Sequence, residues 1–234
     1  MALQSGRRPL LLGHRGCRLK KFCENSNAAF EHSLNVGCDG FEFDVRLTSD
    51  RKLICVHDET IKRCDVGSAD YEQLCKLYLK SWIGPERTAL ATLPEVVKRF
   101  AGRAFLDIEL KVAGIEEPVA DLLRGADPER YVVSSFLPQV IRRMAEIEPT
   151  IPLGYISRRL DALRAWPNLP GKYVIPRHDL VSHELITAVH EAGRKLLTWT
   201  VNSPKEMRAL AEWGADGIIS DDPKLLSETL GFGR

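Results

Sequence analysis

Charged and apolar residues alternate in two short segments of the chain. Residues 41–46 read Phe-Glu-Phe-Asp-Val-Arg, and residues 106–111 read Leu-Asp-Ile-Glu-Leu-Lys. Successive side chains of a β-strand point to opposite faces, so one face of each predicted strand is apolar and the other is charged. Strands that are buried on both sides are usually apolar throughout. The charged faces of these two segments therefore mark them as candidates for chemistry.

The two charged faces hold carboxylates that would converge inside the protein. They are contributed by Glu42, Asp44, Asp107 and Glu109, accompanied by Arg46 and Lys111. Converging carboxylates repel one another and lose hydration unless a cation lies among them. A hard divalent ion with oxygen ligands, Mg²⁺ or Ca²⁺, relieves both costs. The alternative is an internal ladder of salt bridges, in which Arg46 and Lys111 neutralise Glu42 and Asp44.

Two of the six histidines lie where predicted strands end. His14 follows the apolar run 10–12 and stands between a glycine and Arg15, while His57 ends the run 53–56. The carboxyl ends of barrel strands are where active sites form, so both histidines are interpreted as part of the site. An unperturbed pKa of about 6.5 suits a histidine to proton transfer near neutrality. We expect His32, His183 and His190 at helix surfaces, and leave open whether His178 lines the barrel mouth.

Strand and helix patterns alternate along the whole chain. Strands are predicted at 10–12, 41–47, 104–110, 131–135, 152–157, 173–176, 195–201 and 217–220. Helices are predicted at 25–36, from the N-cap Thr92, and at 115–123, 138–146, 160–166, 182–192, 203–213 and 223–230. Alternation of this kind implies a parallel sheet, and eight strand–helix units imply its closure. The expected fold is α/β, a (β/α)8 TIM barrel formed by residues 1–234 as a single domain.

One part of the chain departs from this alternation. A further strand at 52–57 follows a polar turn at 48–51, which predicts a hairpin with the strand 41–47. Residues from about 59 to 90 are rich in charged and aromatic side chains. They are interpreted as a small insertion, part helix and part loop, that stands above the barrel after its second strand.

Composition excludes several classes of function. With 33 basic and 32 acidic residues the net charge is +1, which argues against nucleic acid or an anionic membrane as the main partner. No apolar run approaches the ~18 residues of a membrane span, and the N-terminal run of three leucines is too short for a signal peptide. The six cysteines lie between positions 17 and 75 and form no C-x-x-C pair. Thiols in that arrangement predict a cytoplasmic protein rather than a secreted disulfide framework.

The chain resembles the glycerophosphodiester phosphodiesterase family along nearly its whole length. The family's opening pattern is matched by His14-Arg15-Gly16 and Glu24-Asn25-Ser26, and its second signature by residues 40–45 and 56–58. Glu109-Leu110-Lys111 matches a third motif, and the segments 135–136, 199–202 and 214–221 are also similar to the family pattern. Cys23, Asp50-Arg51 and Lys62-Arg63-Cys64 depart from it, which bears on the preferred substrate.

The resemblance implies an activity and a role for each matched residue. The activity is metal-dependent hydrolysis of a small glycerophosphodiester to sn-glycerol 3-phosphate and an alcohol. It implies that Glu42, Asp44 and Glu109 bind Mg²⁺ or Ca²⁺ and that His14 and His57 are the general acid and base. Arg15 and Lys111 would hold the phosphate, and Phe136 and Trp199 would shape the glycerol pocket. In the family mechanism, the glycerol 2-hydroxyl attacks phosphorus to give a cyclic phosphate, which water then opens.

Three other readings are weighed against this one. A lysophospholipase D-like activity would need an apolar entrance, which Leu74, Leu77, Tyr78, Leu79, Trp82 and Ile83 could provide. A barrel that only binds phosphorylated ligands would have lost a histidine or a carboxylate. A phosphosugar isomerase or synthase would bind phosphate near 214–223, but would leave the inward carboxylates unexplained. The sequence leaves open the alcohol, the metal, which histidine is the acid, the role of the cysteines and the oligomeric state.

Overall fold

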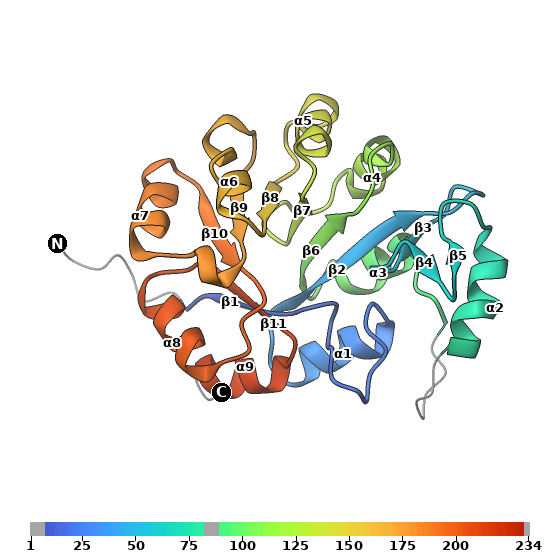
Figure 1. Ribbon diagram of the computed structural model, residues 1–234, viewed down its shortest axis with the longest axis horizontal. Helices are drawn as coiled ribbons and strands as arrows, with labels where there is room; N and C mark the ends of the chain where they lie inside the picture. The colour runs from blue at the N-terminus through green and yellow to red at the C-terminus, as the bar shows by residue number, and fades with distance from the viewer. Residues whose placement is uncertain (1–7, 82–88, 232–234) are drawn as a thin grey trace.

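The protein folds as a closed barrel of eight parallel strands surrounded by helices (Figure 1). The structure is a computed structural model that describes residues 8–81 and 89–231. The barrel strands are β1 (Leu10–Gly13), β2 (Gly40–Leu47), β6 (Phe105–Leu110), β7 (Tyr131–Ser135), β8 (Leu153–Ser157), β9 (Tyr173–Pro176), β10 (Lys195–Thr198) and β11 (Gly217–Ser220). The barrel is closed because β1 pairs with both β2 and β11. This confirms the predicted (β/α)8 fold.

The outer ring consists of helices that follow the barrel strands. They are α1 (Asn27–Asn35), α3 (Leu93–Phe100), α4 (Glu116–Leu123), α5 (Pro138–Ile147), α6 (Leu160–Leu163), α7 (His183–Glu191), α8 (Pro204–Glu212) and α9 (Pro223–Leu230). Aromatic side chains join this ring to β2: Phe30 of α1 stacks on Phe41 at 4.3 Å between ring centroids, and Phe100 of α3 meets Phe41 edge-on at 5.1 Å. The apolar face of β2 therefore points to the helices, as its alternation predicts.

The inside of the barrel is apolar in one part and charged where β2 and β6 line it. Leu12, Val132, Ile156 and Ile175 belong to one buried cluster inside the barrel. On β6, Leu106, Ile108 and Leu110 pack instead into the outer core with the helices. Their neighbours along β6 must then point inward. The charged face of each strand is thus turned into the barrel.

The segment after β2 forms a small substructure beside the barrel, drawn next to α2 in Figure 1. β3 (Leu53–Cys55) pairs antiparallel with β2, which confirms the predicted hairpin. A second hairpin, β4 (Thr60–Ile61) with β5 (Cys64–Asp65), was not predicted. Its turn residues Lys62 and Arg63 adopt φ of 51° and 66°, where glycine or asparagine is usual, so the sequence lacks the customary turn signal. Helix α2 (Tyr71–Ser81) follows.

Two large side chains of α2 pack inward. Leu74 and Tyr78 are buried in a cluster with Ile54 and Val66. Leu77, also considered for an apolar entrance, is partly buried against the same cluster. Trp82, Ile83 and the side chain of Leu79, the remaining candidates, lie outside what the structure describes. Within the described ranges, no helix is both long and apolar enough to cross a membrane.

Candidate active site

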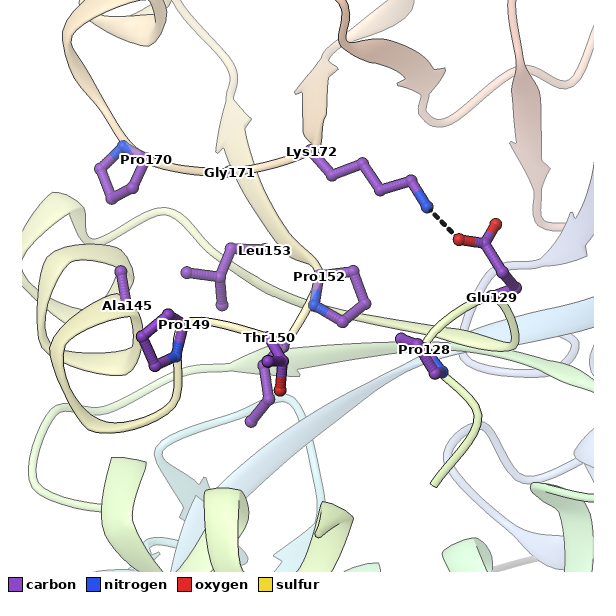
Figure 2. Close-up of a pocket in the computed structure, with 11 residues that line it drawn as sticks. Pro128, Glu129, Ala145, Pro149, Thr150, Pro152, Leu153, Pro170, Gly171 and Lys172 are labelled. Carbon is purple, nitrogen blue, oxygen red and sulfur yellow. Dashed lines mark hydrogen bonds and ion pairs between the residues drawn. The ribbon is translucent and has the colours of Figure 1, made fainter. Parts of the chain in front are cut away.

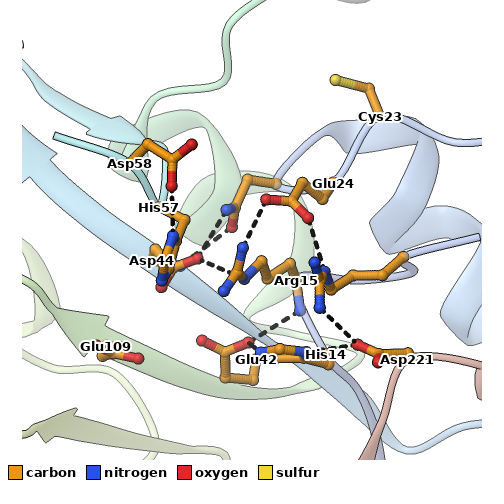
Figure 3. A network of polar contacts seen from close by, with 12 residues as sticks. His14, Arg15, Cys23, Glu24, Glu42, Asp44, His57, Asp58, Glu109 and Asp221 are labelled. Atoms are coloured by element: carbon orange, nitrogen blue, oxygen red, sulfur yellow. Dashed lines mark hydrogen bonds and ion pairs between the residues drawn. The ribbon is translucent and has the colours of Figure 1, made fainter. Parts of the chain in front are cut away.

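The register of two neighbouring strands brings the predicted metal ligands together. β2 and β6 run parallel with Glu42 opposite Asp107 and Asp44 opposite Glu109. Glu42, Asp44 and Glu109 are buried, and their ligand oxygens all lie within 4.8 Å of one another. Figure 3 shows these three carboxylates in one network view with His14 and His57. The structure therefore gathers all three predicted ligands at one point.

The electrostatics of this cluster are compatible with a bound cation. Glu42 Oε1 is buried and has no hydrogen-bond partner. Burial, together with the charges of Asp44 and Glu109, raises the pKa of Glu42 well above its ordinary value. Burial and the charge of Asp44 also raise the pKa of Glu109 to about 7. A hard divalent cation among three carboxylate oxygens would satisfy the orphaned oxygen and offset the repulsion.

Two basic side chains reach the same cluster. Lys111 Nζ lies 2.6 Å from Glu109 Oε1 and 3.4 Å from Asp44 Oδ1, and Arg15 Nε lies 3.2 Å from Asp44 Oδ2. Burial would raise the pKa of Asp44, but Arg15 and Lys111 hold it below its ordinary value. The predicted phosphate-binding residues thus face the predicted metal ligands. Lys111, through its contact with Asp44, also forms part of the salt-bridge ladder that the sequence left as an alternative, whereas Arg15 was not assigned to that ladder.

Arg46 does not take the place in that ladder that the alternative assigned to it. Its Nε donates a hydrogen bond to the carbonyl oxygen of His57 at 2.8 Å, and its Nη2 lies 3.9 Å from Glu59. Arg46 therefore fixes the turn that carries His57, because its guanidinium reaches past the carboxylates to the end of the β3 segment.

His14 is placed by a tight turn at the end of β1. Its backbone N–H donates to Ser220 at 2.8 Å, and Gly16 donates back to Gly13 at 3.1 Å. Gly16 has φ of +78°, and a Cβ at Gly13 would lie 1.9 Å from the Gly16 carbonyl oxygen, so the turn requires both glycines. Arg15, between them, also has a positive φ of 50°. This backbone presents His14 and Arg15 to the barrel mouth.

The two predicted catalytic histidines differ in their surroundings. His14 has a side chain that is 10% exposed; its Nδ1 lies 2.7 Å from Asp221 Oδ1 and its Nε2 lies 3.8 Å from Glu42 Oε2. Burial lowers the pKa of His14 and outweighs the hydrogen bond to Asp221, which raises it. His57 is 34% exposed, and its Nδ1 lies 2.8 Å from Asp58. Each histidine therefore has a carboxylate on its Nδ1, and within the described residues no hydrogen bond engages either Nε2.

The two predicted pocket aromatics contact each other, and one of them lies near Lys111. Phe136, which follows β7, and Trp199, which follows β10, meet edge to face at 5.5 Å between ring centroids. The indole Nε1 of Trp199 donates to the carbonyl of Ile175 at 3.2 Å, which fixes the ring. Lys111 Nζ lies 5.6 Å from the centre of the Phe136 ring. Phe136 is thus connected to the carboxylate cluster through Lys111.

Three residues that hold the site together were not assigned roles from the sequence. Asn25 Nδ2 donates to Asp44 Oδ2 at 2.8 Å, and its Oδ1 accepts from the Asp44 backbone at 3.1 Å. Glu24 Oε1 accepts from Arg15 at 2.6 Å. Asp221 bonds to His14. All three stand inside segments that match the family pattern, so the motifs indicated them without indicating what they contact.

Asp107 lies inside the barrel beside the cluster without joining it. Its Oδ1 accepts from Ser134 Oγ at 2.5 Å, and its Oδ2 is buried without a hydrogen-bond partner. Burial raises the pKa of Asp107 to about 7. The alternating pattern correctly placed this carboxylate inside, but it does not belong to the group of three ligands.

A hollow lies at the end of the barrel opposite to the histidines and carboxylates, before β7, β8 and β9 (Figure 2). It measures about 370 Å³ and is lined by proline-rich turns, with a Lys172–Glu129 ion pair of 2.5 Å at its edge. Among the residues that the structure describes, the one acidic group with metal-binding spacing is Glu42, Asp44 and Glu109. The candidate active site is therefore the end where those carboxylates and the two histidines meet.

Comparison with known proteins shows the family of the chain. The model of the glycerophosphoryl diester phosphodiesterase family matches residues 14–225. YhdW of Bacillus subtilis (strain 168) is 33% identical over 224 residues, 87% of this chain and 90% of that protein. The glycerophosphodiester phosphodiesterase of Caldanaerobacter subterraneus subsp. tengcongensis is 31% identical over 234 residues, 93% of this chain and 96% of that protein.

Solved structures share the fold. An Oleispira antarctica phosphodiesterase in complex with the product sn-glycerol-3-phosphate superposes with a TM-score of 0.83 at 21% identity, covering 96% of this chain and 98% of that chain. A Thermotoga maritima glycerophosphodiester phosphodiesterase superposes with a TM-score of 0.80 at 22% identity, covering 96% and 99%. On the family match and these relatives, the chain belongs to the glycerophosphoryl diester phosphodiesterase family.

Proposed function

We propose that this protein hydrolyses small glycerophosphodiesters to sn-glycerol 3-phosphate and an alcohol, with a divalent metal ion and two histidines. The observation that carries the proposal is the buried group of Glu42, Asp44 and Glu109, which faces both His14 and His57. The product bound in the Oleispira antarctica relative is the product expected here.

Glu42, Asp44 and Glu109 would hold the ion, with Mg²⁺ and Ca²⁺ both compatible with an all-oxygen set. When bound, the ion supplies positive charge that lets a nucleophile approach the phosphodiester anion. Arg15 and Lys111 add two fixed cations beside it, so the phosphate oxygens would be held as negative charge develops on them. Lys111 would then exchange part of its contact with Glu109 for a contact with phosphate.

His14 and His57 would transfer the protons. One takes the proton of the glycerol 2-hydroxyl as its oxygen attacks phosphorus, and the other gives a proton to the departing alcohol. In the second half-reaction the roles reverse. The histidine that gave its proton takes one from the water that opens the cyclic phosphate, and the other histidine gives its proton to the 2-oxygen, which restores the 2-hydroxyl. The Nε2 atoms would carry out these steps, because both Nδ1 atoms are bonded to carboxylates.

Small diesters are proposed as substrates in preference to lipids. Leu74 and Tyr78 of α2 pack into a buried cluster, so these side chains are not part of an apolar entrance. Phe136 and Trp199 would contact the glycerol moiety beside Lys111. The competing lysophospholipase D-like activity would use the same metal and histidines on a lipid.

Cytoplasmic location is part of the proposal and is supported by the cysteines. All six lie in the described part of the chain, and none of them is joined in a disulfide. Thiols kept in this state are typical of a reducing compartment.

The test is the release of glycerol 3-phosphate by the purified protein from glycerophosphocholine and glycerophosphoethanolamine, compared with lysophosphatidylcholine micelles. Faster turnover of the two small diesters is expected. Faster turnover of the micelles would replace the proposed substrate class with the lipid one. A folded, metal-supplemented protein that cleaves none of the three would contradict the proposed hydrolysis.

A further inference from the structure

We propose that Asp221, held by Asn202, is a positioning residue for His14: it keeps the imidazole hydrogen on Nδ1 and turns Nε2 toward the carboxylate cluster. The role of His14 in turnover rests on the proposed function. The hydrogen bond and the tautomer do not, because they are properties of the folded chain alone.

The contacts of His14 determine which of its nitrogens carries the hydrogen. Its Nδ1 lies 2.7 Å from Asp221 Oδ1, and its Nε2 lies on the other side of the ring, 3.8 Å from Glu42 Oε2. A carboxylate can only accept a hydrogen bond, so the hydrogen of a neutral imidazole must lie on Nδ1. Nε2 then presents its lone pair to the site. This is the nitrogen that must exchange a proton with substrate in either catalytic role.

The carboxylate of Asp221 is itself held in position by neighbouring side chains. Asn202 Nδ2 donates to Asp221 Oδ2 at 2.8 Å, while Asn202 Oδ1 accepts from the Asp221 backbone and from Ser220 Oγ, both at 3.0 Å. Arg18 Nη1 lies 3.4 Å from Asp221 Oδ1. Both carboxylate oxygens are therefore engaged by other residues, and the oxygen that faces His14 is fixed in position.

Two further residues connect the Asp221–His14 pair to the predicted phosphate ligand Arg15. Arg18 Nε donates to Glu24 Oε2 at 2.8 Å, and Arg15 Nη1 donates to Glu24 Oε1 at 2.6 Å. Arg18 and Glu24 thus link Asp221 to Arg15 across the loop after β1, and Figure 3 shows Glu24, Arg15, His14 and Asp221 together. One network orients the imidazole and a predicted phosphate ligand.

The other histidine has no equivalent support. His57 bonds to Asp58, its neighbour in the chain, whose side chain is 77% exposed. An exposed partner competes with water and orients a ring weakly. The Asp221–His14 pair, in contrast, joins the two ends of the chain and places the ring in a buried setting. We therefore expect the loss of Asp221 to cost much more activity than the loss of Asp58.

The size of the expected effect follows from tautomer control. An imidazole that loses its orienting carboxylate can rotate or carry its hydrogen on the wrong nitrogen, and losses of about 10²–10⁴ in kcat are typical of such changes. For Asp221→Ala we expect kcat to fall about 10²-fold or more, with KM changed by less than about threefold because Asp221 does not contact substrate. Asn202→Ala, which frees Asp221, should lower kcat by a smaller factor.

The chain provides a matched control at the other end of the same strand. Asp216, just before β11, accepts from the Leu196 backbone at 2.7 Å and lies 2.8 Å from His190 Nε2. Asp216→Asn removes the charge of an Asp–His pair from β11 without touching the barrel mouth. Its kcat should match that of the wild type.

The experiment combines steady-state kinetics with ¹⁵N NMR of histidine-labelled protein, in which the spectrum of His14→Gln assigns the His14 nitrogens. We expect Nδ1–H for neutral His14 in the wild type and loss of that single tautomer in Asp221→Ala, together with the drop in kcat. Asp221→Asn is the second variant, used if the alanine protein does not fold. Its amide can donate to Nδ1 and shift the hydrogen to Nε2, again with reduced kcat.

Two results would overturn the proposal. One is a hydrogen on Nε2 of neutral His14 in the wild type, and the other is Asp221 variants with a kcat within twofold of the wild type. If the wild type cleaves no diester at all, the proposed function fails while the NMR result still decides the positioning of His14. If the wild type is active and the variants are normal, the function stands and the positioning role is contradicted.

Discussion

At the scale of single residues, two carboxylates on one strand have opposite electrostatic surroundings. Asp44 is surrounded by Arg15, Lys111 and Asn25, and its pKa is held below its ordinary value despite its burial. Glu42 receives one backbone hydrogen bond, from Arg15 at 2.9 Å, and its other oxygen has no partner. Its pKa is raised by burial and by its acidic neighbours. Glu42 is therefore the carboxylate that gains most from a bound cation.

Glu42→Gln should weaken metal binding while leaving the fold intact. Outer-shell substitutions at metal sites commonly cost ~10–100-fold in affinity, and loss of a direct ligand should cost at least that much. Without metal, the variant should be as stable as the wild type or more so, because it no longer buries that charge. Calorimetric titration and thermal unfolding measure the two effects. Glu116→Gln, at a buried carboxylate on α4, is the control; equal affinities for Glu42→Gln and the wild type would remove Glu42 from the ligand set.

His14→Ala and His57→Ala should each lower kcat by about 10²–10⁴, the usual weight of a general acid or base. Metal affinity and the circular dichroism spectrum should be unchanged, since neither imidazole is a proposed ligand. His190→Ala, on α7 and bonded to Asp216, should keep full activity. A variant of His14 or His57 with nearly normal kcat would exclude that histidine from the reaction.

Asp107 should make the metal-free protein less stable as pH rises. Burial raises its pKa from 3.8 to about 7, so between these values the folded state holds a proton that the unfolded state has released. The folded state binds more protons, and its stability must fall with increasing pH. Asp107→Asn lacks this loss. Between pH 5 and pH 7, the difference between the free energies of unfolding of Asp107→Asn and the wild type should therefore shift in favour of the variant by roughly 2 kcal/mol, at about 1.4 kcal/mol per pKa unit.

Denaturant unfolding in the presence of a chelator, at several pH values, checks this expectation. The comparison between the two proteins cancels the contribution of His14, whose lowered pKa acts in the opposite direction below neutrality. A constant difference between Asp107→Asn and the wild type from pH 5 to 8 would contradict the raised pKa.

At the scale of secondary-structure elements, the alternation in two strands was enough to predict which carboxylates face inward. The contacts that complete the site could not be predicted in this way. Asp44 on β2 meets Asn25, which precedes α1, and His14 meets Asp221 across 207 positions of sequence. Periodicity carries information about direction along one strand, whereas these contacts depend on how separate elements are packed. The hairpin β4–β5 was missed because its strands are too short for a pattern and its turn lacks glycine.

Helix starts offer an element-scale test, because two N-cap residues in this chain differ in whether their side chains accept a capping hydrogen bond. Thr92 forms a capping box with Glu95 at the start of α3. Ser203, the N-cap of α8, makes no side-chain capping bond. Thr92→Ala should destabilise the protein by about 1 kcal/mol, and Ser203→Ala by much less. Chemical denaturation measures both, and equal losses would contradict the role of the capping box.

At the scale of the whole molecule, the site exists because the barrel closes. β1 pairs with β11 on one side and with β2 on the other, which places His14 between Asp221 and Glu42. The order of strands and helices predicted closure, and the structure confirmed it. The sequence did not predict that His14, after the first strand, would bond to Asp221, after the last. The metal and phosphate groups and His14 thus come from β1, β2 and β6 or the residues that follow them, and His57 follows β3.

The most direct test of the account is turnover of glycerophosphoethanolamine by protein stripped with a chelator, then supplied with Mg²⁺ or Ca²⁺. Activity should be lost on stripping and restored by one or both ions, with release of glycerol 3-phosphate. Glu42→Gln, treated in parallel, should need more metal for the same rate. Full activity of the stripped wild-type protein would contradict the claim that the buried carboxylates serve a metal-dependent hydrolysis.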